Sequence, residues 1–336
     1  MDLSTRYLGL QLANPLVASA SPMSQTVDGV RQLADAGIGA VVLYSLFEEQ
    51  LRREAEQDAQ RAEAGSESFA ESLTYFPEAA RTDHGPRRYL SLLERAVEAV
   101  SIPVIGSINA STPGSWARYA RSMQDCGAAA VELNIYSLPG DSHISGRDFE
   151  ERHIEILAQV KDAVSVPVAV KLSPFFSATA EMARRLDLAG ADALVLFNRF
   201  LQPDIDPETL AVARGTSLSR AAEVRLPLTW ITLLHGRINA SLAATTGVEG
   251  STEVVKYLLA GADVVMTASA LLRHGPAYSA VLLTGLRDWM DRKGYSAINE
   301  FRGLLAVPIG TDEAAHERED YVSALRRANS AAYGPW

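Results

Sequence analysis

The sequence contains a single cysteine, Cys126, among 336 residues. One thiol excludes an internal disulfide, and it excludes a protein-held iron–sulfur cluster, because such a cluster needs several thiolates. Long apolar runs are missing too: no stretch approaches the roughly 20 residues of a membrane-spanning helix, and the N-terminus lacks the basic-then-apolar pattern of a signal peptide. We therefore expect a cytoplasmic protein that does not bind a membrane.

Positive charge is also scarce. The 31 lysines and arginines are outnumbered by 41 aspartates and glutamates, which gives a formal net charge of −10. Nucleic-acid binding is not expected, because it needs a basic surface. The six histidines show no metal-ligand spacing and no G-x-G-x-x-G follows a strand, so we expect neither a metal site nor a dedicated dinucleotide-binding domain.

From Asn14 onward, short apolar segments alternate with amphipathic helical segments, which is the pattern of an α/β protein with a parallel sheet. Eight strands are expected, at residues 15–20, 40–45, 103–108, 129–136, 167–173, 192–198, 241–246 and 263–268. Eight βα units predict one (β/α)8 TIM barrel over residues 1–310, followed by a polar C-terminal tail at residues 311–336. A doubly wound sheet is the alternative, but polar residues at several strand ends favour a barrel mouth.

Two long insertions interrupt the βα pattern. Residues 48–84 are rich in Glu and Arg and are too long for an ordinary βα loop, so they form either a lid over the barrel mouth or a solvated helical insertion. Residues 199–226 carry Pro203, Pro207 and Gly215, and they too are expected to lie over the mouth.

The stretch at residues 241–276 contains two consecutive βα units. Gly247 breaks the first unit after its strand, and Thr267-Ala268-Ser269 opens the helix of the second. Helix openings leave N–H groups without partners, and the loops after the last two strands of a TIM barrel are the usual phosphate site. We interpret the stretch as a phosphate-binding site; two ordinary βα turns are the alternative.

Lys171 lies near the end of an expected strand, between apolar neighbours. A cation buried at the top of a barrel needs an anionic or electron-rich partner, and either a flavin or a salt bridge to a barrel carboxylate such as Glu132 provides one. Asn134 and Asn198 also fall at strand ends. Their amides can donate and accept, which suits a planar heterocycle with alternating C=O and N–H groups, although either amide could instead satisfy a loop carbonyl.

These segments resemble the FMN-dependent dihydroorotate dehydrogenases, in particular the soluble class 1 branch. The similarity is carried by LANPLVASAS, GAVVLYS, VELNIYS, PVAVKLSP, GADVVMTASALLRHGP and KGYSAINEFRG. It implies a TIM barrel with FMN at its mouth, oxidation of dihydroorotate to orotate in pyrimidine biosynthesis, and a homodimer. The electron acceptor stays open between fumarate, NAD through a partner subunit, and oxygen.

The resemblance also assigns residues. It places the FMN phosphate on the backbone of Thr246, Gly247, Thr267 and Ala268. It places the isoalloxazine ring beside Ser19, Ala20, Asn109 and Asn134, with Lys171 on the N1 side of the flavin. It assigns the pyrimidine to Asn134 and Asn198, with Tyr44 as a further substrate contact.

The sequence departs from the class 1 pattern at three positions. Ser137 stands where class 1 has its catalytic cysteine, although the membrane-linked class 2 uses serine there. Tyr44 replaces a lysine that contacts flavin and orotate, and Pro139 replaces an asparagine. Ser137 is thus the expected catalytic base, working with Lys171. The departures keep two alternatives open: a flavoenzyme for another cyclic amide or enone, and a non-catalytic flavin-binding barrel.

Overall fold

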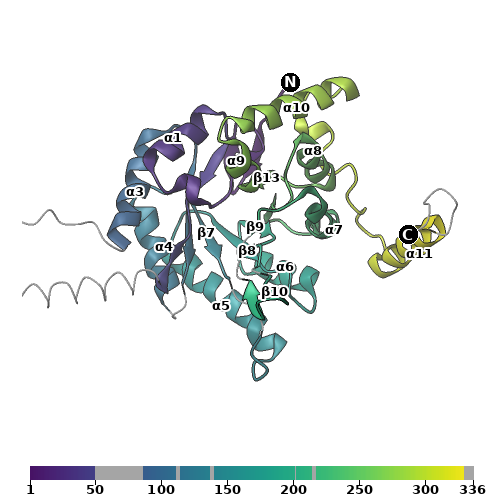
Figure 1. The fold of residues 1–336 in the computed structure, drawn as a ribbon, viewed down its shortest axis with the longest axis horizontal. Coiled ribbons are helices and arrows are strands. Elements are labelled where there is room, and N and C mark those ends of the chain that lie inside the picture. Colours follow the sequence, from purple (N-terminus) through teal and green to yellow (C-terminus); the bar gives the residue numbers. More distant parts are fainter. Residues whose placement is uncertain (50–85, 111–113, 137–139, 201, 214–216, 329–336) are drawn as a thin grey trace, which may run out of the picture.

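The structure is a computed structural model that describes residues 1–49, 86–110, 114–136, 140–200, 202–213 and 217–328. Eight parallel strands close into a barrel in the order β3, β4, β6, β7, β8, β9, β12, β13 and back to β3 (Figure 1). The strands are β3 Leu16–Ala18, β4 Ala40–Val42, β6 Val104–Asn109, β7 Ala130–Asn134, β8 Val168–Leu172, β9 Ala193–Leu196, β12 Ser241–Ala244 and β13 Val264–Thr267. All eight expected strands form, so the TIM barrel is confirmed and the doubly wound sheet is excluded.

Helices surround the barrel and shield its outer face (Figure 1). They are α1 Val27–Asp35, α3 Pro86–Ala99, α4 Ser115–Asp125, α5 Gly146–Ala163, α6 Thr179–Leu188, α7 Arg225–Leu234, α8 Ser251–Ala260, α9 Ser269–His274 and α10 Tyr278–Lys293. Local signals set several ends: Thr26 caps α1 by accepting from Gly29 N, and Gly261 ends α8 in the left-handed conformation at φ 113°. None of the described helices is long and apolar enough to span a membrane.

An N-terminal hairpin plugs one end of the barrel. Its strands β1 Thr5–Tyr7 and β2 Leu10–Leu12 pair antiparallel across a two-residue turn, Leu8-Gly9, in which both residues have positive φ. Tyr7, Leu8 and Leu12 are fully buried, and they cluster with inward-facing residues of the strands. The amino-terminal ends of the barrel strands therefore enclose an apolar core.

Alternation along each strand decides which side chains reach the barrel interior. In β7, Ala130 belongs to the interior cluster, whereas Val131 and Leu133 pack outward against the helices. The same parity turns Glu132 and Asn134 inward, toward the carboxyl ends of the strands. The core at one end and the polar groups at the other thus lie on the same strands.

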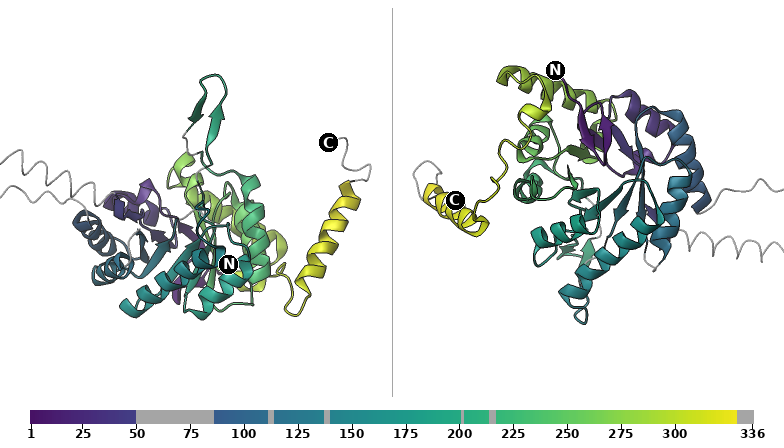
Figure 2. Two further views of the ribbon diagram at one scale, coloured as in Figure 1. Left: turned by 90° about the horizontal axis from the view of Figure 1, so that it is seen from below. Right: turned by 180° about the vertical axis from the view of Figure 1, so that it is seen from behind.

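The insertion at residues 199–226 begins with a hairpin, β10 Asp204–Asp206 and β11 Ala211–Ala213, which stands out from the barrel (Figure 2, left). It continues through the short helix η2 Ala221–Val224 into α7. Residues 50–85 lie outside the described residues, so the prediction that the insertion at 48–84 is a lid or a helical insertion stays untested. Within the expected tail, α11 Glu313–Ala328 is set apart from the barrel (Figures 1 and 2).

Candidate active site

A chain of polar side chains crosses the barrel interior at the carboxyl ends of the strands. Ser107 of β6 donates from Oγ to Glu132 Oε1 at 3.5 Å, and the same oxygen lies 3.9 Å from Lys171 Nζ on β8. The backbone pairing places Asn134 directly beside Lys171. The carboxylate of Glu132, the alternative partner expected for Lys171, therefore lies next to its ammonium.

Burial dominates the electrostatics of this pair. The Glu132 side chain is 1% exposed and that of Lys171 is 10% exposed. Burial raises the pKa of Glu132, while the Lys171 ammonium and the Ser107 hydrogen bond act in the opposite direction. Lysine offers three donors, and its one ion pair within the described part of the chain is to Glu132. The remaining donors are available to a ligand at the mouth.

The two predicted amides contact each other. Asn198 Nδ2 donates to Asn134 Oδ1, and Asn134 Nδ2 donates to Ser45 Oγ at 3.0 Å. Ser45 in turn shares a 2.9 Å hydrogen bond with Ser107. Amide side chains bonded in this way are held in fixed orientations, as recognition of a planar heterocycle requires.

A cavity of about 250 Å³ opens beside these groups. Its wall includes Ser19, Ala20, Lys171, Asn198, Thr246, Thr267 and Ala268. Ser19 Oγ and Thr267 Oγ1 are buried, and neither has a hydrogen-bond partner among the described residues. Buried hydroxyls without partners are unfavourable unless a ligand or a water satisfies them, so the donor set fits a polar cofactor such as a flavin.

In the loop after β12, the Gly247 N–H expected to bind phosphate is hydrogen-bonded within the protein. Thr246 and Gly247 both have positive φ, at 80° and 77°. The Gly247 N–H donates to Ser219 Oγ at 3.1 Å, and Ser219 Oγ also bonds Ser269 Oγ at 2.9 Å. This residue of the 199–226 insertion therefore lies between the two loops that the sequence assigns to phosphate.

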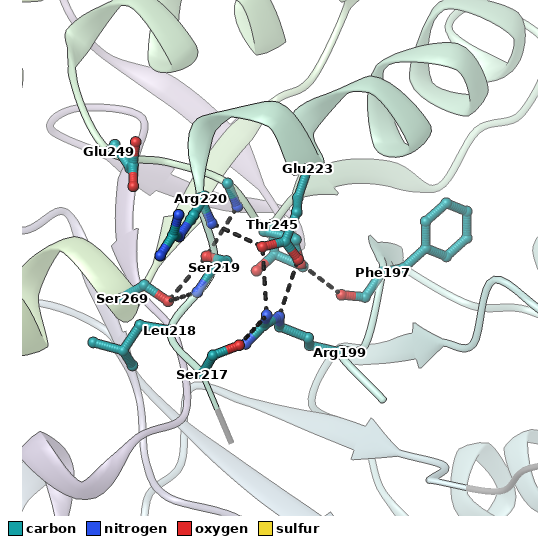
Figure 3. A network of polar contacts seen from close by, with 12 residues as sticks. Phe197, Arg199, Ser217, Leu218, Ser219, Arg220, Glu223, Thr245, Glu249 and Ser269 are labelled. Atoms are coloured by element: carbon teal, nitrogen blue, oxygen red, sulfur yellow. Dashed lines mark hydrogen bonds and ion pairs between the residues drawn. The ribbon is translucent and has the colours of Figure 1, made fainter. Parts of the chain in front are cut away.

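Two arginines hold this part of the insertion in place, and Figure 3 shows the one that pairs with Glu223, Arg199. Arg199 Nε lies 3.1 Å from Glu223 Oε2. On the other side, Arg273 Nη2 donates to the carbonyl of Ser219 at 2.8 Å, and Arg273 Nη1 pairs with Glu249 Oε1 at 3.2 Å. The insertion thus lies over the mouth, as the sequence predicts, in its described part around Ser219.

Two further predicted residues, Asn109 and Tyr44, lie at or just beyond strand ends. Asn109 is buried at the end of β6, on the inward parity of Ser107. The ring of Tyr44, by contrast, packs edge-on against Tyr89 of α3 at a centroid distance of 5.1 Å. Ser137 and Pro139 lie outside the described residues, so the position of the expected base stays a prediction.

Sequence reasoning missed Ser45 and Ser219. Strand alternation from Val42 would turn Tyr44 inward, but β4 ends at Val42, and Ser45 is the residue that reaches Asn134. Ser219 is 28 residues from Gly247 along the chain, inside an insertion without periodicity. Its hydroxyl carries no local signal that could have identified it.

The closed barrel and the polar carboxyl ends of its strands define a TIM-barrel enzyme with its site at the mouth. The family model for dihydroorotate dehydrogenase matches residues 2–290, and the chain belongs to that family. Family membership implies a flavin cofactor.

Three curated relatives carry the name dihydroorotate dehydrogenase B (NAD(+)), catalytic subunit. The one from Methanothermobacter thermautotrophicus is 26% identical over 320 residues, covering 90% of this chain and 98% of the relative. The one from Thermoplasma acidophilum is 26% identical over 323 residues, covering 90% and 98%. The one from Methanosarcina mazei is 28% identical over 302 residues, covering 88% and 93%. The similarity therefore extends over nearly the full length of each protein.

Proposed function

We propose that this chain is an FMN-dependent oxidoreductase that oxidises dihydroorotate to orotate in pyrimidine biosynthesis. The observation that carries the proposal is the placement of Lys171 on the cavity wall beside the hydrogen-bonded amides of Asn134 and Asn198, in a barrel of the dihydroorotate dehydrogenase family. A cation and paired amides match the two needs of the reaction: stabilising negative charge on a reduced cofactor and orienting a cyclic amide.

Each group has a proposed task. Ser19 and Thr267 offer hydroxyls to the cofactor, and Lys171 directs an ammonium toward it. FMN, when bound, supplies the hydride acceptor. Asn134 and Asn198 hold the pyrimidine ring, and Ser137 takes the proton from the carbon adjacent to the hydride donor. A serine is a weak base at neutral pH, so it needs a neighbour or a water chain that relays the proton onward.

The test begins with the visible spectrum of the purified protein, and the flavin released on denaturation is identified by its mass. Anaerobic addition of dihydroorotate should then bleach the flavin bands and release orotate. A protein that binds no flavin would contradict the whole proposal. Bound FMN that dihydroorotate does not bleach would contradict the substrate alone.

A second candidate substrate is favoured by an aromatic cluster at the mouth. Tyr136, Phe175 and Phe200 follow β7, β8 and β9, and Tyr136 stacks on Phe200 at a centroid distance of 4.5 Å and an angle of 15°. Tyr136 and Phe175 are 42% and 44% exposed. Such a wall suits a cyclic amide or enone with a flat apolar substituent. Bleaching by such a compound, but not by dihydroorotate, would select this alternative.

The electron acceptor and the assembly belong to the same proposal. The name of each of the three relatives specifies NAD(+) and a catalytic subunit, which supports NAD reached through a partner subunit as the acceptor. Reoxidation of the reduced protein by fumarate alone would contradict that route. The expected homodimer stays a prediction, which sedimentation of the purified protein tests.

A further inference from the structure

Glu132 is the one acidic residue in the described part of the barrel strands whose side chain points into the barrel near the mouth. It is fully buried, and its Oε1 is shared between Ser107 and Lys171. Its Oε2 has no partner among the described residues. The carboxylate is therefore only partly compensated, and a partly compensated buried charge is costly.

A structural role alone does not account for this arrangement. Buried ion pairs can often be replaced by apolar side chains of similar volume without loss of stability. The contact between Glu132 and Lys171 is long for an ion pair, at 3.9 Å, and it contributes no close charged hydrogen bond. What the pair does provide is a fixed negative charge directly behind a cation that faces the cavity.

Two phenols near Glu132 are neutral and add no charge beside its carboxylate. Two tyrosines interact electrostatically with Glu132: Tyr7 from the plugging hairpin and Tyr89 from α3. Burial raises the pKa of both phenols well above the ordinary value, so both stay neutral at neutral pH. Arg199 also lines the cavity, but it is paired with Glu223. Lys171 and Glu132 therefore dominate the field at the inner wall of the cavity.

We propose that Glu132 acts through Lys171 as a positioning residue: its carboxylate holds the ammonium at the cavity wall and offsets part of its charge, which lowers the reduction potential of the bound flavin. This inference rests on the proposed function. In a low-dielectric interior, charges this close act strongly on a neighbouring group. A negative charge behind the lysine disfavours the anionic reduced flavin, and the lysine favours it.

The test compares Glu132→Gln, Lys171→Met and the double variant at pH 8. Glutamine keeps an oxygen that can accept from Ser107 and removes the charge. The flavin midpoint potential and the affinity for sulfite, which forms an anionic flavin adduct, should therefore both rise above wild type. Lys171→Met should lower both. Asp192→Asn is the matched control. Asp192 forms an ion pair with Lys161, with Nζ and Oδ2 2.6 Å apart, and this pair does not line the cavity. The control variant should leave potential and sulfite affinity unchanged.

The outcomes separate the inference from the function on which it rests. A wild-type protein without bound flavin overturns the proposed function, and with it the inference. A flavin-loaded Glu132→Gln protein with the wild-type potential and sulfite affinity overturns the inference alone.

The unfolding free energy adds a readout that does not need flavin. Glu132→Gln should change it by different amounts in the wild-type and Lys171→Met backgrounds, since contacting residues couple. Equal changes in the two backgrounds would show that Glu132 does not hold Lys171, which also overturns the inference.

Discussion

The two ends of the barrel interior are built from the same strands with opposite chemistry. At the amino end, Ala130 and Ala169 meet Tyr7 and Leu12 of the plugging hairpin in an apolar cluster. Two residues further along β7 and β8, the inward positions are Glu132 and Lys171. The inward residues that stabilise the barrel and those proposed to act in the reaction are thus about two strand positions apart, or roughly 7 Å. Substitutions at the amino end should therefore lower stability, whereas those at the carboxyl end should lower activity or FMN binding.

The largest effect is expected at the carboxyl end, from Ser137→Ala. Removing the proposed base should slow flavin reduction by about 10²–10⁴-fold, the usual contribution of general base catalysis, while FMN stays bound. Rapid mixing with dihydroorotate under anaerobic conditions measures the rate. Ser145→Ala is the control: Ser145 caps α5 by accepting from Asp148 N, so its loss should affect stability only. An unchanged rate in Ser137→Ala would remove Ser137 from the mechanism.

The glycines at the two ends allow a matched comparison. Gly9 and Gly247 have nearly the same φ, at 73° and 77°, so alanine is strained by a similar amount at both. A Cβ at Gly9 meets nothing within 4 Å, whereas at Gly247 it would lie 2.8 Å from Val224 N and 3.0 Å from Arg220 O.

Gly247→Ala should therefore displace the neighbouring insertion and weaken FMN binding by about tenfold or more, or at least ~1.4 kcal/mol. Gly9→Ala should keep the wild-type affinity. Fluorescence titration of each apoprotein with FMN measures both. Equal affinities would mean that the phosphate lies away from the Gly247 loop.

At the amino end, Leu12→Ala should leave a cavity in the apolar cluster. Leu12 is 1% exposed, and removing such a side chain costs about 2–5 kcal/mol. Urea unfolding measures this loss. The rate of flavin reduction per bound FMN should stay at the wild-type value. A slower rate in the folded, FMN-loaded variant would show that the two ends of the barrel are coupled.

The smallest effect is the pH dependence that Glu132 contributes. Burial raises the pKa of this carboxyl above the ordinary 4.5, so the folded state binds the proton more tightly than the unfolded state. The resulting stability is present below about pH 4.5 and is lost as pH rises through the folded pKa, by about 1.4 kcal/mol per unit of pKa difference. As pH rises, the free energy of unfolding of wild type should therefore fall relative to that of Glu132→Gln. A constant difference would contradict the raised pKa.

The strands could be predicted from the sequence because each is a short apolar run with its own boundaries. PVAVKLS illustrates this: Pro167 precedes the strand, and β8 Val168–Leu172 lies within the expected segment. Lys171 could be identified as well, because a charge inside such a run has few structural explanations. Its partner Glu132 is found the same way, inside the buried run of β7.

Side-chain direction beyond a strand end could not be predicted. Tyr44 and Ser45 are adjacent, and which one faces the mouth depends on where β4 stops and on the ring of Tyr89, which lies 45 residues further along the chain. The contact between Ser219 and Gly247 likewise joins an irregular insertion to a loop. Such contacts arise from the tertiary packing and carry no periodic signal.

The charged end of the barrel carries the proposed chemistry, and Lys171→Met tests this most directly. The variant is loaded with FMN and mixed anaerobically with dihydroorotate, and the bleaching of the flavin is followed in time beside wild type. Loss of a cation that stabilises developing charge should slow bleaching by about 10²–10³-fold. Bleaching at the wild-type rate would show that Lys171 serves only the ion pair with Glu132, and would contradict the account.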